Sequence, residues 1–248
     1  GWWDVTVEKE GAHHIISAPI VVDATGPGGR ITGNIPCLDG IESGYENMAL
    51  AIFAVAEGVP CNKEALQFFF GSPFVDGYGW IFPRDDDAVN IGFGIPARAA
   101  QGHSLRQRLL DFIFRNNPHA KIRTICGGKV PLHSAHRSPF AMHGLFKAGD
   151  AAGCVDPIWG AGISEALECG RIVGKNIPDW LGKTDPEERR HVEGRIFDQW
   201  MDLCGNFYQK SASAKELMNK ITDDQWDIFL HHMSNLPREN QASVLNTL

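Results

Sequence analysis

The sequence of 248 residues has no apolar run near the roughly 20 residues that span a bilayer, and its first residues lack the basic, apolar pattern of a signal peptide. Its six cysteines never form C-x-x-C, which argues against a zinc site or a disulfide framework and favours reduced thiols in the cytoplasm. Basic residues are outnumbered, 23 Lys and Arg against 30 Asp and Glu, so we expect no nucleic-acid partner.

Metal ligands are also scarce. His133, His136 and His143 share one segment but have no third partner at ligand spacing. The acidic run 85–87 is interpreted as a solvated turn between strands. We therefore expect no metal site.

The G-x-G-x-x-G fingerprint of dinucleotide-binding folds is absent. The sequence begins with Gly inside a predicted strand, in which Trp3, Val5 and Val7 alternate with polar residues, and a turn at Glu10-Gly11 leads into a second strand. Because a domain seldom begins within a hairpin, these features together predict an amino-terminal truncation.

Hydrophobic patterning predicts a strand unit, then a β-rich insertion, then a strand–turn–helix unit and a helical tail. The apolar run 18–26 suits a central parallel strand. Further strands are predicted at 48–56, 66–70, 78–82, 89–95, 122–126, 128–131 and 145–150, and helices at 104–115, 162–173, 193–209 and 223–233.

The most restrictive motif is G-D-A-A-G-x-x-D-P-x-x-G-x-G-I, from Gly149 to Ile163. Asp150, at the end of a predicted strand, can accept hydrogen bonds from ribityl hydroxyls. The small residues let a cofactor approach the backbone, and the helix that follows presents its positive end, which would stabilise a reduced, negatively charged flavin. The alternative is an ordinary glycine-rich strand-to-helix connection. The predicted cofactor contacts are Gly149, Asp150, Ala151, Pro157, Gly160, Ala161, Gly162 and Ile163.

A second motif places aromatic residues two apart. Tyr78, Trp80 and Phe82 should project from one face of a strand. A hairpin centred on 85–87 would put Gly94 opposite Tyr78, Gly92 opposite Trp80 and Asn90 opposite Phe82, so that the rings lie over bare glycine as an apolar floor. The alternative is an aromatic strand in an ordinary core.

A third segment, Val21-Val22-Asp23-Ala24-Thr25-Gly26, ends a predicted parallel strand with a small-residue turn. We add Gly26 to the candidate cofactor contacts. A generic parallel strand end remains the alternative.

The first motif resembles flavoprotein hydroxylases and, more closely, the geranylgeranyl reductase family. The second resembles the family's Y-x-W-x-F-P…G-x-G signature, which implies that Tyr78, Trp80, Phe82, Gly92 and Gly94 face a lipid pocket. The D-A-T-G string at 23–26 is similar to flavin-dependent halogenases, so a halogenase or monooxygenase stays an alternative. A non-catalytic fragment unable to hold FAD and a generic α/β protein are the others.

The resemblance implies an α/β fold with an incomplete Rossmann-type FAD domain (1–27 and 143–180), an inserted antiparallel β substrate domain (28–142) and C-terminal helices (181–248). It implies FAD-dependent reduction of prenyl-lipid C=C bonds, with hydride from reduced flavin and a proton for which Tyr78 is the candidate donor. The electron donor, NAD(P)H or ferredoxin, is left open. For the tail, an apolar stripe at Trp226, Phe229 and Leu230 indicates packing on the body or peripheral membrane contact.

Overall fold

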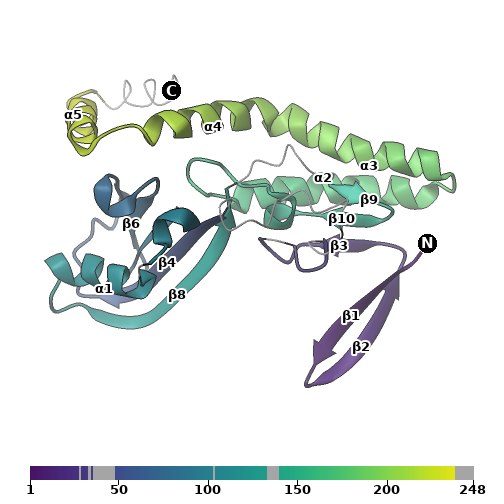
Figure 1. Ribbon diagram of the computed structural model, residues 1–248, viewed down its shortest axis with the longest axis horizontal. Coiled ribbons are helices and arrows are strands. Elements are labelled where there is room, and N and C mark those ends of the chain that lie inside the picture. The colour runs from purple at the N-terminus through teal and green to yellow at the C-terminus, as the bar shows by residue number, and fades with distance from the viewer. Residues whose placement is uncertain (28, 33–34, 36–47, 103, 133–139, 238–248) are drawn as a thin grey trace. The chain divides into compact units, whose positions relative to one another are not determined.

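The computed structural model describes residues 1–27, 29–32, 35, 48–102, 104–132 and 140–237 (Figure 1). The chain divides into two compact units. Unit 1 comprises Gly1–Met48 and Val130–Ala212, and unit 2 comprises Ala49–Lys129 and Ser213–Leu248. Unit 1 is thus built from segments on either side of the sheet-forming stretch of unit 2.

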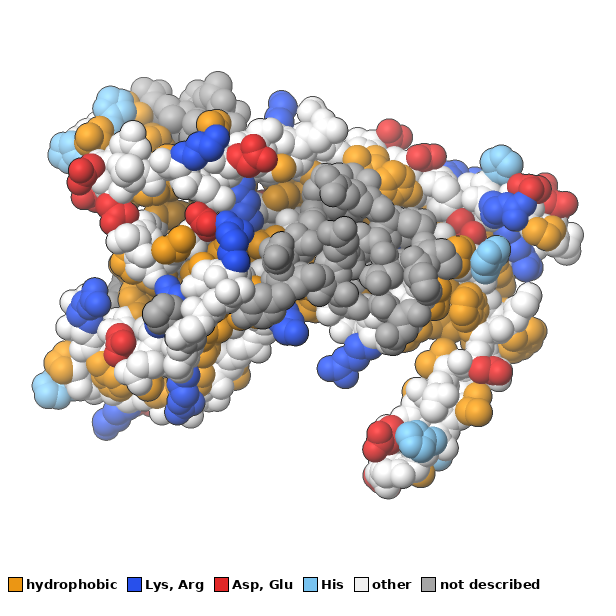
Figure 2. Space-filling view, viewed as in Figure 1, with side chains coloured by type: hydrophobic (Ala, Val, Ile, Leu, Met, Phe, Trp, Pro, Cys, Tyr) orange, Lys and Arg blue, Asp and Glu red, His pale blue; other side chains and the backbone are white. Residues whose placement is uncertain are grey.

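An antiparallel hairpin opens unit 1, with strands β1 (Trp3–Lys9) and β2 (Ala12–Ala18). Glu10 and Gly11 form its turn with φ of 53° and 77°, which confirms the predicted turn. Ile15 stays 70% exposed, and apolar side chains are visible on the hairpin surface (Figure 2).

A three-stranded sheet follows, in the order β3 (Val21–Asp23), β10 (Leu145–Lys147) and β9 (Ala141–Met142). β3 and β10 pair in parallel, as predicted for β3. The predicted central position of β3 is wrong for the described sheet. β10 lies in the middle, and Val22 of β3 is 42% exposed. Because β3 and β10 run in the same direction, their carboxyl ends lie at the same end of the sheet.

Helices complete unit 1: α2 (Ile163–Gly182), α3 (Pro186–Trp200), a π-helical turn (Met201–Gly205) and α4 (Asn206–Met218), whose last residues belong to unit 2. α2 runs well beyond the predicted end at residue 173, through Pro178, because Trp180 is buried in the core and its Nε1 donates to Glu193 Oε1 at 2.8 Å. Asp185 caps α3 by accepting from the Glu187 and Glu188 amides.

Unit 2 contains a five-stranded sheet in the order β5-β6-β7-β4-β8. One face buries Ile91 and Phe93 against Leu109 and Ile113 of helix α1, which forms the hydrophobic core of the unit. The predicted segments 122–126 and 128–131 form one continuous strand. The bounds are β4 (Met48–Glu57), β5 (Gln67–Phe69), β6 (Tyr78–Pro83), β7 (Ala88–Pro96), α1 (Leu105–Asn116) and β8 (Lys121–Pro131).

The helical tail belongs to both units, unlike the single region predicted for 181–248. The reason is packing: Trp200 and Tyr208 are buried in the core of unit 1, whereas Trp226 of α5 (Asp223–Ser234) stacks on Phe70 in unit 2. Among the described residues, none of the helices has the length and apolarity that a bilayer crossing requires.

Candidate functional site

The G-D-A-A segment forms a short 3-10 turn (Gly149–Ala152) directly after β10. The predicted strand therefore ends at Lys147, and Asp150 lies in the turn beyond it. Gly149 has a φ of 60°, and a Cβ there would lie 3.2 Å from the Cβ of Ala166 on α2. Positive φ and close helix packing both favour glycine at this position.

Asp156 folds the next part of the motif. Its Oδ1 accepts from the amides of Ile158 at 2.7 Å and Trp159 at 3.2 Å. Its own amide donates to Ala161 O at 2.7 Å, and its carbonyl accepts from the Gly160 amide at 2.9 Å. The sequence included this aspartate in the motif without a role; the structure shows that it closes the loop.

The loop leads into the amino terminus of α2, where no side chain caps the helix. Ile163, the first helical residue, is 83% exposed. A Cβ on Gly162 would lie 3.2 Å from Asp150 Oδ1, so even alanine would crowd the carboxylate. The motif thus brings Asp150 to the positive end of a helix.

The Asp150 carboxylate is half-buried, and burial raises its pKa above the ordinary value. Its carboxylate makes no hydrogen bond to any of the residues described here. Partial burial opposes its ionisation, and its oxygens are open to donors from outside the protein, such as the hydroxyl groups of a ligand.

Asp23, at the end of β3, is the opposite case. Its buried carboxylate accepts from the amides and hydroxyls of Thr25 and Thr32 and from the Ile31 amide, at 2.7 to 3.2 Å. Burial alone would raise its pKa, but these hydrogen bonds outweigh burial and lower it. Asp23 therefore holds its own loop together. Gly26 follows with a φ of 87°, and a Cβ there would meet no atom within 4 Å.

We expect Asp23→Asn to destabilise the protein by about 3 kcal/mol or more at neutral pH, because an amide nitrogen would face buried donors, each costing about 1–3 kcal/mol. Since the folded-state pKa is lowered, the carboxylate stabilises the fold above its unfolded pKa of about 3.9, and this is lost as pH falls through the folded value. Urea unfolding at several pH values from neutral to acidic should show that the variant's loss in free energy of unfolding, relative to the parent, becomes smaller in acid. The exposed Asp198→Asn is the control; equal effects of both would contradict this role.

These residues fit the ring and ribityl half of a flavin. Gly26 and the Gly149–Gly162 loop follow two adjacent parallel strands, and ligands of open α/β sheets bind outside the carboxyl ends of such strands. The loop exposes backbone at its glycines and leads into a helix start that no side chain caps. It also carries the Asp150 carboxylate, to which no described residue donates a hydrogen bond. The residues of this chain offer no comparable fingerprint for the adenosine half.

The aromatic strand pairs in the predicted register: Tyr78 lies opposite Gly94, Trp80 opposite Gly92, and Phe82 opposite Asn90. Tyr78, Trp80 and Phe82 line the sheet face opposite the α1 core, and all three are half-buried. Their neighbouring ring centroids are 5.8 and 5.9 Å apart.

The sequence prediction missed one member of this face, Phe68, and the bond that another, Asn90, makes. Phe68 of β5 lies opposite Trp80, with its ring 5.7 Å from Tyr78 and 5.4 Å from Phe82. Asn90 accepts a hydrogen bond of 2.8 Å from Trp80 Nε1, which fixes the indole.

Gly92 and Gly94 of β7 have different roles. A Cβ on Gly94 would lie 3.8 Å from the Trp80 ring, so this glycine does lie beneath an aromatic ring. A Cβ on Gly92 would instead come within 2.5 Å of Phe53 Cβ on β4. Gly92 is required by the close approach of β4, and only Gly94 matches the expected glycine floor.

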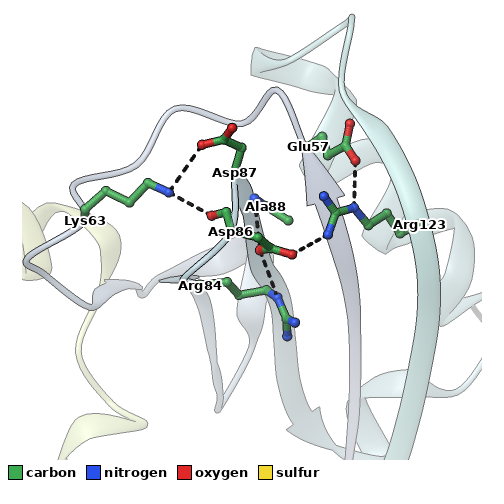
Figure 3. Close-up of polar contacts among 7 residues, drawn as sticks. All are labelled: Glu57, Lys63, Arg84, Asp86, Asp87, Ala88 and Arg123. Carbon is green, nitrogen blue, oxygen red and sulfur yellow. Dashed lines mark hydrogen bonds and ion pairs between the residues drawn. The ribbon is translucent and has the colours of Figure 1, made fainter.

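The acidic tip of the β6–β7 hairpin is a network of ion pairs (Figure 3). Asp86 bonds to Arg123 and to Arg84 Nε at 3.3 Å, and Lys63 lies 3.9 Å from Asp87. The Arg123 bond lowers the pKa of Asp86. These contacts give the acids a structural role.

No group of three or more His, Cys, Asp or Glu suited to a metal ion occurs among the described residues. His133 and His136 lie outside the described residues, and His143 is exposed in a turn. On the face shown in Figure 2, basic side chains are interspersed with acidic and apolar ones.

Residues 47–130 match the family model described as geranylgeranyl reductase catalytic domain. This range contains the aromatic strand and both glycines of the second motif. Over 231 residues the chain is 30% identical to digeranylgeranylglycerophospholipid reductase 3 of Methanosphaera stadtmanae, covering 89% of this chain and 55% of that protein. The corresponding reductase of Methanosarcina mazei is 27% identical, over 96% of this chain and 58% of its own length. The chain thus spans little more than half of these relatives.

Solved structures show the same fold. A geranylgeranyl bacteriochlorophyll reductase-like protein from Thermoplasma acidophilum superimposes with a TM-score of 0.81 at 20% identity, over 96% of this chain and 64% of that one. The flavin-dependent halogenase CmlS is more distant, with a TM-score of 0.58 at 19% identity, over 81% of this chain and 37% of that one. The predicted α/β flavoprotein fold is therefore confirmed. Together these matches show that the chain is similar to geranylgeranyl reductases, with the catalytic-domain model matching residues 47–130.

Proposed function

We propose that this chain supplies the ring-side flavin contacts and the substrate-binding sheet of an FAD-dependent enzyme that reduces C=C bonds of prenyl lipids. The observation that carries the proposal is the Gly149–Gly162 loop. It joins a half-buried Asp150 carboxylate, which no described residue bonds to, to a helix start without a side-chain cap at the carboxyl ends of parallel strands. The family match over the aromatic sheet, and relatives named for digeranylgeranylglycerophospholipids, support the substrate class.

Flavin, when bound and reduced, supplies hydride to one carbon of the alkene. Asp150 would accept hydrogen bonds from the ribityl hydroxyls and so position the ring. The positive end of α2 would stabilise negative charge on the reduced ring. Backbone at Gly160, Ala161 and Gly162 allows close approach.

On the sheet, the aromatic face would bind the apolar chain and exclude water from it. Tyr78 has the one hydroxyl among Phe68, Tyr78, Trp80 and Phe82, and we propose it as the proton donor to the second alkene carbon.

Peripheral membrane contact is a further part of the proposal, because a prenyl-lipid substrate resides in a bilayer. Trp226 and Phe229 of α5 are half-buried, with their rings 6.0 Å apart, whereas Ile228 and Leu230 are 71% and 45% exposed. These two exposed side chains are therefore better placed for lipid than the indole.

The test is anaerobic incubation of the protein with dithionite-reduced FAD and digeranylgeranylglycerophospholipid, followed by mass spectrometry. We expect the lipid to gain two hydrogens for each double bond reduced. A parallel aerobic reaction with NADPH, chloride and an aromatic substrate tests the alternatives. A halogenated or hydroxylated aromatic product in the aerobic reaction, without reduction of the alkene in the anaerobic one, would favour a halogenase or monooxygenase. Failure of the protein to bind flavin at all would favour a non-catalytic role.

A further inference from the structure

We propose that Trp226 closes one end of the aromatic face and thereby limits the length of prenyl chain that this face accepts. This inference rests on the proposed function, to which it adds a specificity-determining residue. Trp226 lies outside residues 47–130, which match the catalytic-domain model, and its position follows from contacts within unit 2.

The first support is a continuous row of rings. From Phe82 the row passes along β6 through Trp80 to Tyr78, with centroids 5.9 and 5.8 Å apart. It continues to Phe70 at 6.3 Å and from there to Trp226 at 4.8 Å, where the two rings stack at an interplanar angle of 15°. The row thus begins on the sheet and ends on α5.

The second support is the anchoring of α5 beside Phe70. Asp223, in the first turn of α5, accepts a hydrogen bond of 2.8 Å from the Ser72 amide. The intervening Gly71 has a φ of 103°, and a Cβ there would lie 2.8 Å from Asp223 Oδ1, so only glycine permits this contact. A capping box at Thr222 fixes the start of the same helix. The indole is therefore held in place from both chain segments.

The third support is the nature of the surface. The core of unit 2 lies on the opposite face of the sheet, so the rings of the row remain partly accessible, and Phe68 beside them is 40% exposed. At the Phe82 end the strand runs into the charged hairpin tip, which an apolar chain would avoid. A prenyl chain lying along the row would meet Trp226 at the other end.

The end wall predicts a length preference. One extra or missing methylene in an apolar pocket changes selectivity by about 10- to 200-fold, and an isoprene unit is larger than that. Removing the indole should open the end and favour longer chains, whereas a merely structural tryptophan would affect every chain length alike.

The experiment is equilibrium dialysis of labelled farnesol, geranylgeraniol and geranylfarnesol, which increase by one isoprene unit each. We expect Trp226→Ala to raise affinity for geranylfarnesol relative to geranylgeraniol by about tenfold or more. Trp226→Phe should retain the parent ratio, and Trp226→Leu should be intermediate. Asp227→Ala, at an exposed position of the same helix, is the control.

Thermal unfolding checks that each variant folds, and the leucine variant keeps the test decisive should the alanine variant unfold. An unchanged ratio in Trp226→Ala or Trp226→Leu, or equal weakening for all three alcohols, would overturn the end-wall role alone. Failure of the unsubstituted protein to bind any prenyl alcohol would overturn the proposed function and this inference together.

Discussion

Replacing Asp150 with alanine is expected to weaken flavin binding by roughly 10- to 100-fold without destabilising the flavin-free protein. Hydrogen bonds to a charged acceptor are each worth about 1.5–3 kcal/mol, and tenfold in affinity corresponds to about 1.4 kcal/mol. The loss should be specific to flavin because the carboxylate makes no hydrogen bond to the described residues. In this respect Asp150 differs from Asp23 and Asp156, whose carboxylates accept hydrogen bonds from their own loops.

The effect on stability has a definite sign. Burial raises the folded-state pKa of Asp150, so its ionisation opposes folding at any pH above its unfolded pKa of about 3.9. Alanine removes this cost. We therefore expect the flavin-free variant to be as stable as the parent at neutral pH, or slightly more stable, as is common where a residue serves binding at the expense of the fold.

The measurement is a fluorescence titration with FMN, which carries the ring, ribityl chain and one phosphate, alongside FAD. Asp156→Ala is the contrasting variant, because that carboxylate accepts the Ile158 and Trp159 amides and its loss should destabilise the loop itself. Equal flavin affinity in Asp150→Ala and the parent would contradict the assigned role, as would a large loss of stability in the flavin-free variant.

The aromatic hairpin was the part of the fold most open to prediction from sequence. Alternation fixes which side chains share a face, and the acidic run at 85–87 fixes the centre of the turn, so the register of Tyr78 with Gly94 follows. Both constraints are local. They require no knowledge of how the rest of the chain folds.

The residues that sequence reasoning missed depend on pairing that is not local. Phe68 lies in a segment that was predicted as a strand (66–70), but it joins the face only because β5 pairs with β6, and the sequence of the segment does not specify that partner. Asn90 was placed opposite Phe82, yet it bonds to Trp80, its diagonal neighbour. Long side chains reach diagonally across a sheet, so a register alone does not identify the hydrogen-bond partner.

The three aspartates of the parallel strand ends show the same limit. Asp23, Asp150 and Asp156 all lie in the motifs at these strand ends, and only Asp150 was predicted to contact the cofactor. In the structure, Asp23 and Asp156 are satisfied by amides and hydroxyls of their own loops, and only Asp150 lacks such donors. The course of a loop decides whether an acid serves the fold or a ligand, and short motifs do not encode that course.

Trp80→Ala is expected to impair binding and turnover of prenyl substrate by about 10- to 100-fold while leaving flavin content near that of the parent. A large apolar side chain contributes about 1.5–3 kcal/mol when its surface is buried, and substrate would bury the exposed part of this indole. The ring lies between Tyr78 and Phe82 on the face away from the core, so the fold should tolerate its loss better than the substrate site does.

Three further variants separate the contributions to this face. Trp80→Phe keeps a ring and should retain most binding, whereas Asn90→Ala keeps the indole but releases its Nε1 and should raise KM more than it lowers kcat. Tyr78→Phe removes only a hydroxyl; a proton donor there predicts a fall in kcat of about 10²-fold or more with substrate affinity unchanged. Flavin absorbance, prenyl-alcohol binding and reduction are measured on each variant. Parallel loss of flavin and substrate in Trp80→Ala would show that the tryptophan is structural, because removing a substrate contact alone leaves the flavin loop of unit 1 unchanged.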